Sequence, residues 1–259
     1  MAMNSVNTNV GAMIALQNLQ VTNNELTQVQ SRINTGKKVA TAKDNGAVWA
    51  IAQGQRAEIG ALNAVKDSLQ RGQSAVDVSL AAGESVSDLL VTLKEKALAA
   101  TDTSLTTSAR SALNEDFKSI RDQIATVVSN ASFNGVNLLD GSSTAGFEAL
   151  ANVTGSTITV SSEDMSLSGS VVTLGASDVI DTASAATASL ALVSASIENV
   201  GASLAKLGTG SNSLGTHLTF VGKLQDTLEA GVGNLVDADL AKESARLQAL
   251  QTKQQLGVQ

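Results

Sequence analysis

The chain has 259 residues, a formal net charge of −7 and 43% apolar residues, so it is too hydrophobic for an intrinsically disordered protein. It has no cysteine, which excludes disulfides and thiolate metal sites, and no proline, which favours long uninterrupted helices. Its 17 basic residues are scattered among 24 acidic ones without a basic stripe, so we expect no nucleic-acid partner. The aromatic residues that often fill a globular core are scarce, with one Trp, four Phe and no Tyr.

The first predicted element is an amphipathic helix within residues 1–39. One seam of it repeats at three- and four-residue spacing: Ala12, Ala15, Leu19, Thr22, Leu26, Val29 and Ile33. No charged side chain precedes Glu25, and the other faces carry Asn, Gln, Ser and Thr. This neutral polar surface is typical of a helix that packs among copies of itself. The stretch has neither the basic region nor the continuous apolar run of a signal peptide, and we expect no membrane insertion anywhere in the chain.

After a connector at residues 35–46, three segments show the periodicity of bundle helices. A heptad pattern runs over residues 62–100, a second apolar seam covers 113–127, and a third covers 190–228 with a weak point expected near Gly208. The predicted rod-core residues are Leu62, Leu69, Val76, Leu90, Leu93, Leu113, Phe117, Ile120, Ile124, Leu190, Val193, Ile197, Val200, Leu204 and Leu207.

Residues 132–182 form the only stretch rich in Gly, Ser, Thr and short β-branched runs. The runs at 157–160 and 171–174 predict two strands of a small hairpin region, and Asn134-Gly135 and Asp140-Gly141 are turn signals. Because helical arms flank this region, we expect it at the tip of a folded-back rod. Residues 142–182 contain few obvious core residues, so we expect them to face solvent.

The last predicted helix follows a break at Gly231 and Gly233 and extends to about Gln255, with Asp237 or Asp239 as its cap. The order of elements is then nearly palindromic. The predicted fold is mainly α: a long antiparallel, coiled-coil-like bundle with a small β-hairpin insert and paired N- and C-terminal helices.

No pattern of catalytic residues emerges from the sequence. His217 is the sole histidine, and Asp237 and Asp239 are two residues apart, so helical geometry would not point them at each other. There is no Gly-x-Ser-x-Gly elbow or phosphate-binding loop. We therefore predict no enzyme, no metal and no cofactor. Trp49 could be a core anchor or an intersubunit contact, and both readings stay open.

Several stretches make the chain resemble bacterial flagellin, especially flagellins of alphaproteobacteria. They are residues 6–9 (VNTN), 31–39 (SRINTGKKV), 42–47 (AKDNGA), 133–141 (FNGVNLLDG), 204–208 (LAKLG) and 237–243 (DADLAKE). The resemblance covers nearly the whole chain except the central insert.

The resemblance implies a structural subunit that polymerises into the extracellular flagellar filament for swimming motility. It implies a terminal-helix inner domain (1–40 with 237–259), a rod domain with spokes (41–141 with 183–236) and a variable insert (142–182). The implied partners are other copies or other flagellins, the export apparatus, an export chaperone, and junction and cap proteins. Export would occur without a cleaved signal peptide. The implied subunit-interface residues of the terminal helices are Leu19, Leu26, Val29, Ile33, Leu240, Leu247 and Leu250.

The alternative is a hook-filament junction protein or another secreted, non-polymerising α-bundle that binds a partner. Two departures from the family pattern bear on function. Flagellins usually continue past the position of Gln259 in an apolar half-helix. The segment recognised by the vertebrate Toll-like flagellin receptor usually has Arg at the position of Thr92 and Leu at that of Lys96, so only Glu95 matches. We therefore expect weak recognition by that receptor.

Overall fold

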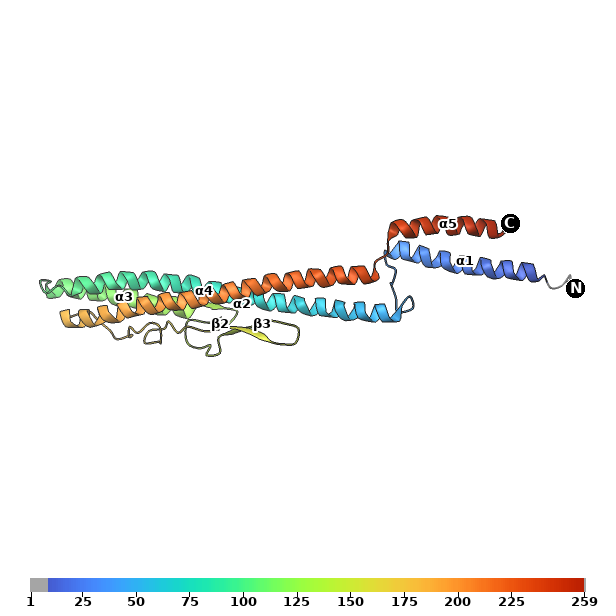
Figure 1. Cartoon of the computed structure of the whole chain (residues 1–259). Coiled ribbons are helices and arrows are strands. Elements are labelled where there is room, and N and C mark those ends of the chain that lie inside the picture. Colours follow the sequence, from blue (N-terminus) through green and yellow to red (C-terminus); the bar gives the residue numbers. More distant parts are fainter. Residues whose placement is uncertain (1–8, 259) are drawn as a thin grey trace. The chain divides into compact units, whose positions relative to one another are not determined.

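The computed structural model describes residues 9–258, and the chain's contacts divide it into two compact units. The terminal unit comprises the residues up to Gly60 and those from Leu224 onward, and the bundle unit comprises Ala61–Lys223. The helices are α1 (Val10–Thr35), α2 (Gly46–Ala100), α3 (Thr107–Asn130), α4 (Ala183–Val236) and α5 (Leu240–Val258) (Figure 1). The predicted mainly α fold is confirmed. The first eight residues of the predicted terminal helix lie outside the described part of the chain.

Two helices are longer than the sequence pattern predicts. α2 begins at Gly46, where the Asn45 side chain accepts a hydrogen bond from the Val48 backbone N–H at 3.1 Å. α4 continues through the predicted weak point at Gly208 and the predicted break at Gly231 and Gly233, so both expectations are wrong. One glycine of α4 shows another use for the residue: a Cβ at Gly210 would lie 2.8 Å from Val160 Cγ1. Glycine there allows close packing and does not end the helix.

In the bundle unit, α2 and α4 run antiparallel. Ser211 Oγ lies 3.4 Å from Asp77 Oδ1, and Gly83 faces Leu204. Ten of the fifteen predicted rod-core residues are buried: Leu62, Leu69, Val76, Leu90, Leu93, Phe117, Ile124, Val193, Val200 and Leu207. The other five are half-buried: Leu113, Ile120, Leu190, Ile197 and Leu204. The seams therefore place aliphatic side chains inside the bundle with Phe117 as a rare aromatic.

The β structure consists of two antiparallel hairpins. β1 (Ser132–Phe133) pairs with β2 (Val136–Asn137), and β3 (Phe147–Leu150) pairs with β4 (Thr157–Val160). The first turn holds Asn134 and Gly135 at φ 51° and 80°, which Asn-Gly tolerates well. The strand predicted at 157–160 is present, whereas the strand predicted at 171–174 is wrong. Those residues bond to α4 side chains instead, since Thr173 N donates to Ser196 Oγ and Asn199 Nδ2 donates to Val171 O.

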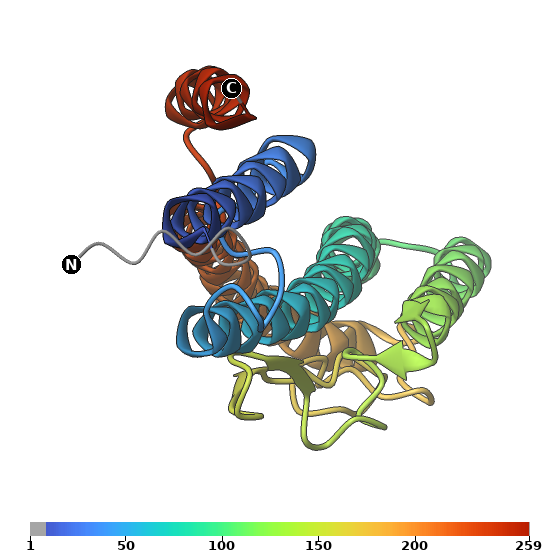
Figure 2. The ribbon, with the colours of Figure 1, turned by 90° about the vertical axis from the view of Figure 1, so that its right-hand side faces the viewer.

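The insert lies along the bundle and is not its tip, which corrects the expectation from sequence (Figures 1 and 2). Leu150 N donates to Ser68 Oγ of α2 at 3.0 Å, and His217 Nε2 of α4 lies 2.6 Å from the Ala151 carbonyl oxygen. The chain reverses instead in the loop between α2 and α3.

The expectation that residues 142–182 bury little is also wrong. Glu163 is 8% exposed and accepts hydrogen bonds from Ser203 Oγ at 2.7 Å and Lys206 Nζ at 3.1 Å. The buried apolar residues of the insert are Ala149, Val160, Met165, Val171, Val172, Leu174 and Ile180, none more than 5% exposed. These residues are spaced irregularly among Ser, Thr and Gly, so no helical or strand period reveals them.

In the terminal unit, the connector after α1 pairs with the segment after α4. Lys38 N donates to Val236 O at 2.8 Å, and Ala238 N donates to Gly36 O at 2.9 Å, on either side of a bridge between Lys37 and Asp237. Beside this pairing lies a small core of Val39, Ala52, Val232 and Val236. Trp49 packs half-buried against that core.

Asp44 holds the connector in shape. Its Oδ2 accepts hydrogen bonds from the backbone N–H groups of Thr41 at 2.8 Å and Ala40 at 3.0 Å. The bond from Thr41 N–H is the largest cause that lowers the pKa of the Asp44 carboxyl below 3.8.

Among the described residues, α4 is the one helix long and apolar enough to cross a membrane by length and composition. Its 54 residues far exceed the roughly 20 that a span needs, and it carries the buried bundle seam. Packing within the bundle accounts for that composition.

Replacing Leu174 by Ala should destabilise the bundle unit by about 2–5 kcal/mol, because it opens a cavity at a side chain that is 0% exposed. Urea unfolding followed by circular dichroism measures the change. Val153→Ala, at a site that is 43% exposed, is the control and should change stability little. Equal effects of the two substitutions would mean that the insert is not anchored as described.

The Asp44 contacts predict a pH-dependent connector. Because the folded pKa lies below the unfolded one, the stabilisation is fully present above pH 3.8 and is lost as pH falls through the folded pKa. In NMR spectra, the amide shifts of Ala40 and Thr41 should titrate together in acid. The Asp44→Asn variant should lack this titration, and its persistence there would assign the transition to another group.

Candidate assembly interface

The paired helices α1 and α5 form the most unusual surface of the terminal unit. Asn9 caps α1 by accepting a hydrogen bond from Ala12 N at 3.1 Å. Asp239 caps α5 by accepting from Ala241 N and Lys242 N, both at 3.1 Å. Of the two predicted capping candidates, Asp239 therefore serves.

The two helices run antiparallel. Arg32 pairs with Glu243, Gln254 Nε2 donates to Asn23 Oδ1 at 2.8 Å, and Gly257 lies beside Leu19. The contact seam uses the heptad positions near the connector, and residues 10–18 of α1 lie beyond the last described residues of α5. Ala12 and Ala15 are accordingly exposed.

The predicted interface residues of the terminal helices divide by burial. Val29 is 1% and Leu250 5% exposed, so within one chain they contact the other terminal helix. Leu19, Leu26, Ile33 and Leu247 are half-buried, and Leu240 is 49% exposed. Five of the seven therefore keep surface that another molecule could cover.

A second apolar stripe of α1 was missed by the heptad reading. Val10, Met13, Ile14 and Val21 are 53–65% exposed. At about 100° per residue they fall on the side of α1 roughly opposite the buried seam. Their spacing of three, four and seven residues was visible in the sequence. We call these four residues the outer stripe.

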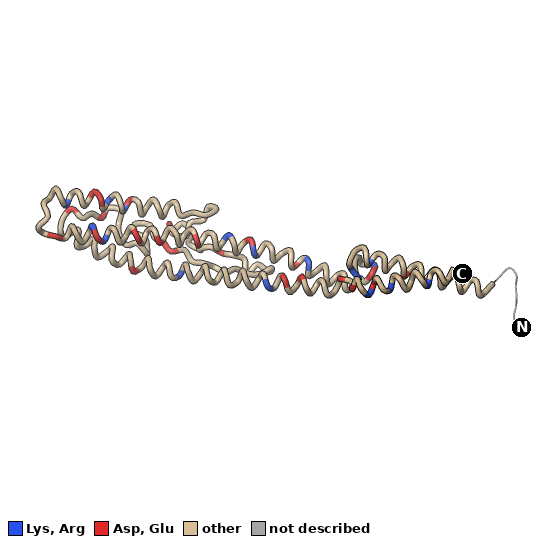
Figure 3. Tube along the Cα trace, turned by 90° about the horizontal axis from the view of Figure 1, so that it is seen from above, with Lys and Arg blue, Asp and Glu red and all other residues tan. Residues whose placement is uncertain are grey.

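Charge is almost absent from this surface. Within α1 the charged residues are Glu25 and Arg32, and Figure 3 shows acidic and basic side chains gathered near the connector. An exposed apolar stripe without surrounding charge is a feature of surfaces that bind other proteins.

The charges near the connector form ion pairs. Arg32 NH1 lies 3.1 Å from Glu243 Oε1, with 24% and 12% of the two side chains exposed. Arg246 NH2 lies 3.9 Å from Glu25 Oε2 at a more exposed position. The first pair borders a cavity of about 580 Å³ between the connector and the start of α5.

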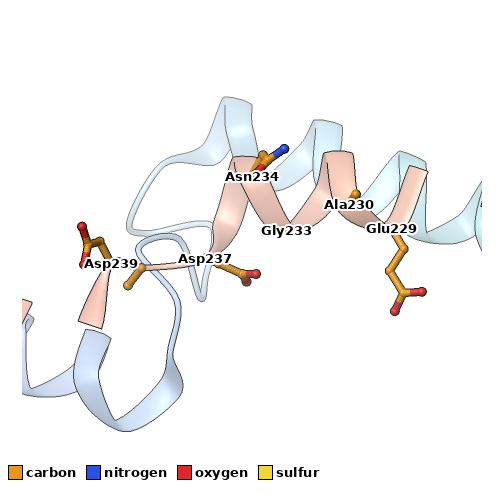
Figure 4. A pocket seen from close by; sticks show the side chains of 7 residues that line it. Glu229, Ala230, Gly233, Asn234, Asp237 and Asp239 are labelled. Atoms are coloured by element: carbon orange, nitrogen blue, oxygen red, sulfur yellow. The ribbon is translucent and has the colours of Figure 1, made fainter. Parts of the chain in front are cut away.

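The acidic residues after α4 do not make a metal site. Figure 4 shows the side chains of Asp237 and Asp239 pointing in different directions. Across residues 9–258, no group of three or more His, Cys, Asp or Glu side chains could hold a metal ion.

The receptor-related positions of α2 lie in the bundle unit. Glu95 is exposed, whereas Thr92 and Lys96 are half-buried. Thr92 Oγ1 donates to the Asp88 carbonyl oxygen at 3.1 Å, and Lys96 Nζ lies 2.7 Å from Asp116 Oδ2 of α3.

Comparison with known proteins finds two family models along the chain. The bacterial flagellin N-terminal helical region matches residues 6–144, and the bacterial flagellin C-terminal helical region matches residues 190–259. Flagellin FljM of Caulobacter vibrioides is 60% identical over 259 residues, which is 100% of this chain and 94% of that protein. A flagellin of Brucella melitensis is 35% identical and covers 99% of this chain and 94% of its own length.

Two solved structures share the fold. The Bacillus cereus flagellin crystal structure matches with a TM-score of 0.52 and 21% identity, covering 60% of this chain and 88% of that one. A putative flagellar hook-associated protein from Vibrio parahaemolyticus matches with a TM-score of 0.62 and 16% identity, covering 75% and 100%. With both terminal regions matched in order and whole-length relatives above half identity, the chain belongs to the bacterial flagellin family.

Proposed function

We propose that this chain is a structural subunit that polymerises into the extracellular flagellar filament used for swimming. The observation that carries the proposal is the outer stripe of α1, four exposed apolar side chains on a helix with two charged residues. In water such a stripe is unfavourable at about 25 cal/mol per Å² of apolar surface, so burial against other copies is favoured.

The functional division follows the family pattern. Residues 1–40 and 237–259 provide the inner assembly domain, 41–141 and 183–236 the rod, and 142–182 the variable insert. The intersubunit contacts use the remaining exposed surface of Leu19, Leu26, Ile33, Leu240 and Leu247, with Val29 and Leu250 holding the two helices together.

The other partners are those of an exported subunit. The chain is secreted by the flagellar export apparatus with a chaperone and without a cleaved signal peptide, and it meets junction and cap proteins in the filament. It acts without catalysis or cofactor. The hook-associated neighbour shares the fold at 16% identity, whereas Caulobacter flagellins reach 58–61% over 259 residues, which favours the filament role over a junction role.

Electron microscopy of the full-length protein under polymerising salt tests this function. Wild-type protein should form long tubes, and Ile14→Asp should abolish them, because a carboxylate in a closed apolar interface costs several kcal/mol. Val153→Asp, an exposed apolar site in the bundle unit, is the matched control and should polymerise normally. Persistent wild-type monomers, or normal tubes from Ile14→Asp, would contradict the proposal.

Weak recognition by the Toll-like flagellin receptor is a second expectation. Thr92 lacks the planar five-donor group of Arg, and Lys96 is held by Asp116 where the usual motif is apolar. The double change Thr92→Arg with Lys96→Leu should raise a receptor reporter response by about ten- to a hundredfold, as expected for one charge-assisted hydrogen bond. Thr92→Arg with Lys94→Leu carries the same change in composition at an exposed neighbouring site. An equal gain from this control would show that the motif positions are not decisive.

A further inference from the structure

The cavity beside the Arg32–Glu243 pair carries two unmet hydrogen-bonding atoms. The pair is joined by one bond, from Arg32 NH1 to Glu243 Oε1 at 3.1 Å. Arg32 Nε and Glu243 Oε2 are both buried and have no hydrogen-bond partner. Glu243 is 9% exposed, so solvent has little access to its free oxygen. Leaving such charged groups unsatisfied is unfavourable, and both residues line the same cavity.

The unmet atoms define the chemistry of an occupant. Arg32 Nε–H is a donor, so the occupant needs an acceptor, and Glu243 Oε2 is an acceptor, so the occupant needs a donor. A cation would repel Arg32, and an anion would repel Glu243. The rest of the lining is equally balanced, with basic Lys38, Lys242 and Arg246 against acidic Asp44, Asp237 and Asp239.

A carboxamide meets both needs in one planar group. Its carbonyl oxygen can accept from Arg32 Nε while its NH₂ donates to Glu243 Oε2. Carboxamides are also abundant on the exposed surface of α1. They are Gln17, Asn18, Gln20, Asn24, Gln28 and Gln30.

We propose that this cavity is a socket for an Asn or Gln side chain from α1 of a second copy of the chain. The inference rests on the proposed assembly function and deepens it by naming a specific polar contact. The apolar outer stripe supplies non-directional burial, whereas the socket fixes the register in which two copies meet.

The first test compares two Arg→Lys variants of the full-length protein. Arg32→Lys keeps the charge that faces Glu243 but removes the Nε–H donor. It should raise the critical concentration for polymerisation by about ten- to a hundredfold. Arg56→Lys is the same substitution in the terminal unit, outside the cavity lining, and should leave the critical concentration unchanged. Equal critical concentrations for the two variants would overturn the socket.

The second test separates the socket from a purely structural role of the ion pair. Each of the six α1 amides is changed to its carboxylate, alone and together with Glu243→Gln. In the correct pair, the new carboxylate accepts from both Arg32 Nε and the Gln amide at 243, so polymerisation should return to within a few-fold of wild type. Glu243→Gln and the matching single carboxylate variant should each polymerise poorly.

The outcomes distinguish the two proposals. A wild-type protein that forms no filament overturns the assembly function itself. A wild type that polymerises, with none of the six swaps rescuing Glu243→Gln, overturns the socket alone and assigns the two atoms to a bridging water. Rescue by one amide position and not by the other five supports the socket and identifies the contact.

Discussion

The terminal unit depends on the short antiparallel pairing of the connector with the segment after α4. The bonds Lys38 N to Val236 O and Ala238 N to Gly36 O join residues about 200 positions apart in the chain. Closing so large a loop costs conformational entropy, which grows only slowly with loop length. The adjacent core of Val39, Ala52, Val232 and Val236 offsets that cost by burying aliphatic side chains. With this joint in place, α1 and α5 start beside each other and their seams can meet.

The bundle unit solves a different problem, which is stability with few aromatic residues. Its aliphatic seams supply most of the buried side chains, and the insert adds Met165, Leu174 and Ile180 at 0% exposure. Polar side chains then lock the irregular backbone onto helices, as when Asn114 Oδ1 accepts from Ile180 N at 2.8 Å and Arg121 NH1 donates to Asp178 O at 2.9 Å. These bonds satisfy backbone groups that would otherwise be buried without partners.

Periodicity predicted the helices and most of the buried seams because a repeat of about 3.6 residues follows directly from helix geometry. It failed where tertiary contacts decide the outcome. Residues 171–174 have the β-branched composition of a strand, yet Thr173 N bonds to Ser196 Oγ, so a helix side chain replaces a strand partner. Gly210 reads as a helix breaker but provides room for Val160. At the candidate interface, the seam through Leu26 and Val29 was predictable, and the outer stripe was equally visible but not sought. The Arg32–Glu243 pair joins positions 211 apart, which no local pattern reveals.

The two stripes of α1 explain how one helix can serve both a folded chain and an assembly. The seam through Val29 is satisfied within the chain by α5, while Val10, Met13, Ile14 and Val21 remain exposed on roughly the opposite side. Had both stripes found partners within one chain, no apolar driving force for polymerisation would remain on α1. Had neither, the helix would depend on assembly even to form, because an isolated amphipathic helix gains most of its stability from packing. Dividing the stripes between intramolecular and intermolecular contacts gives a helix that is ordered by α5 and still able to bind other copies.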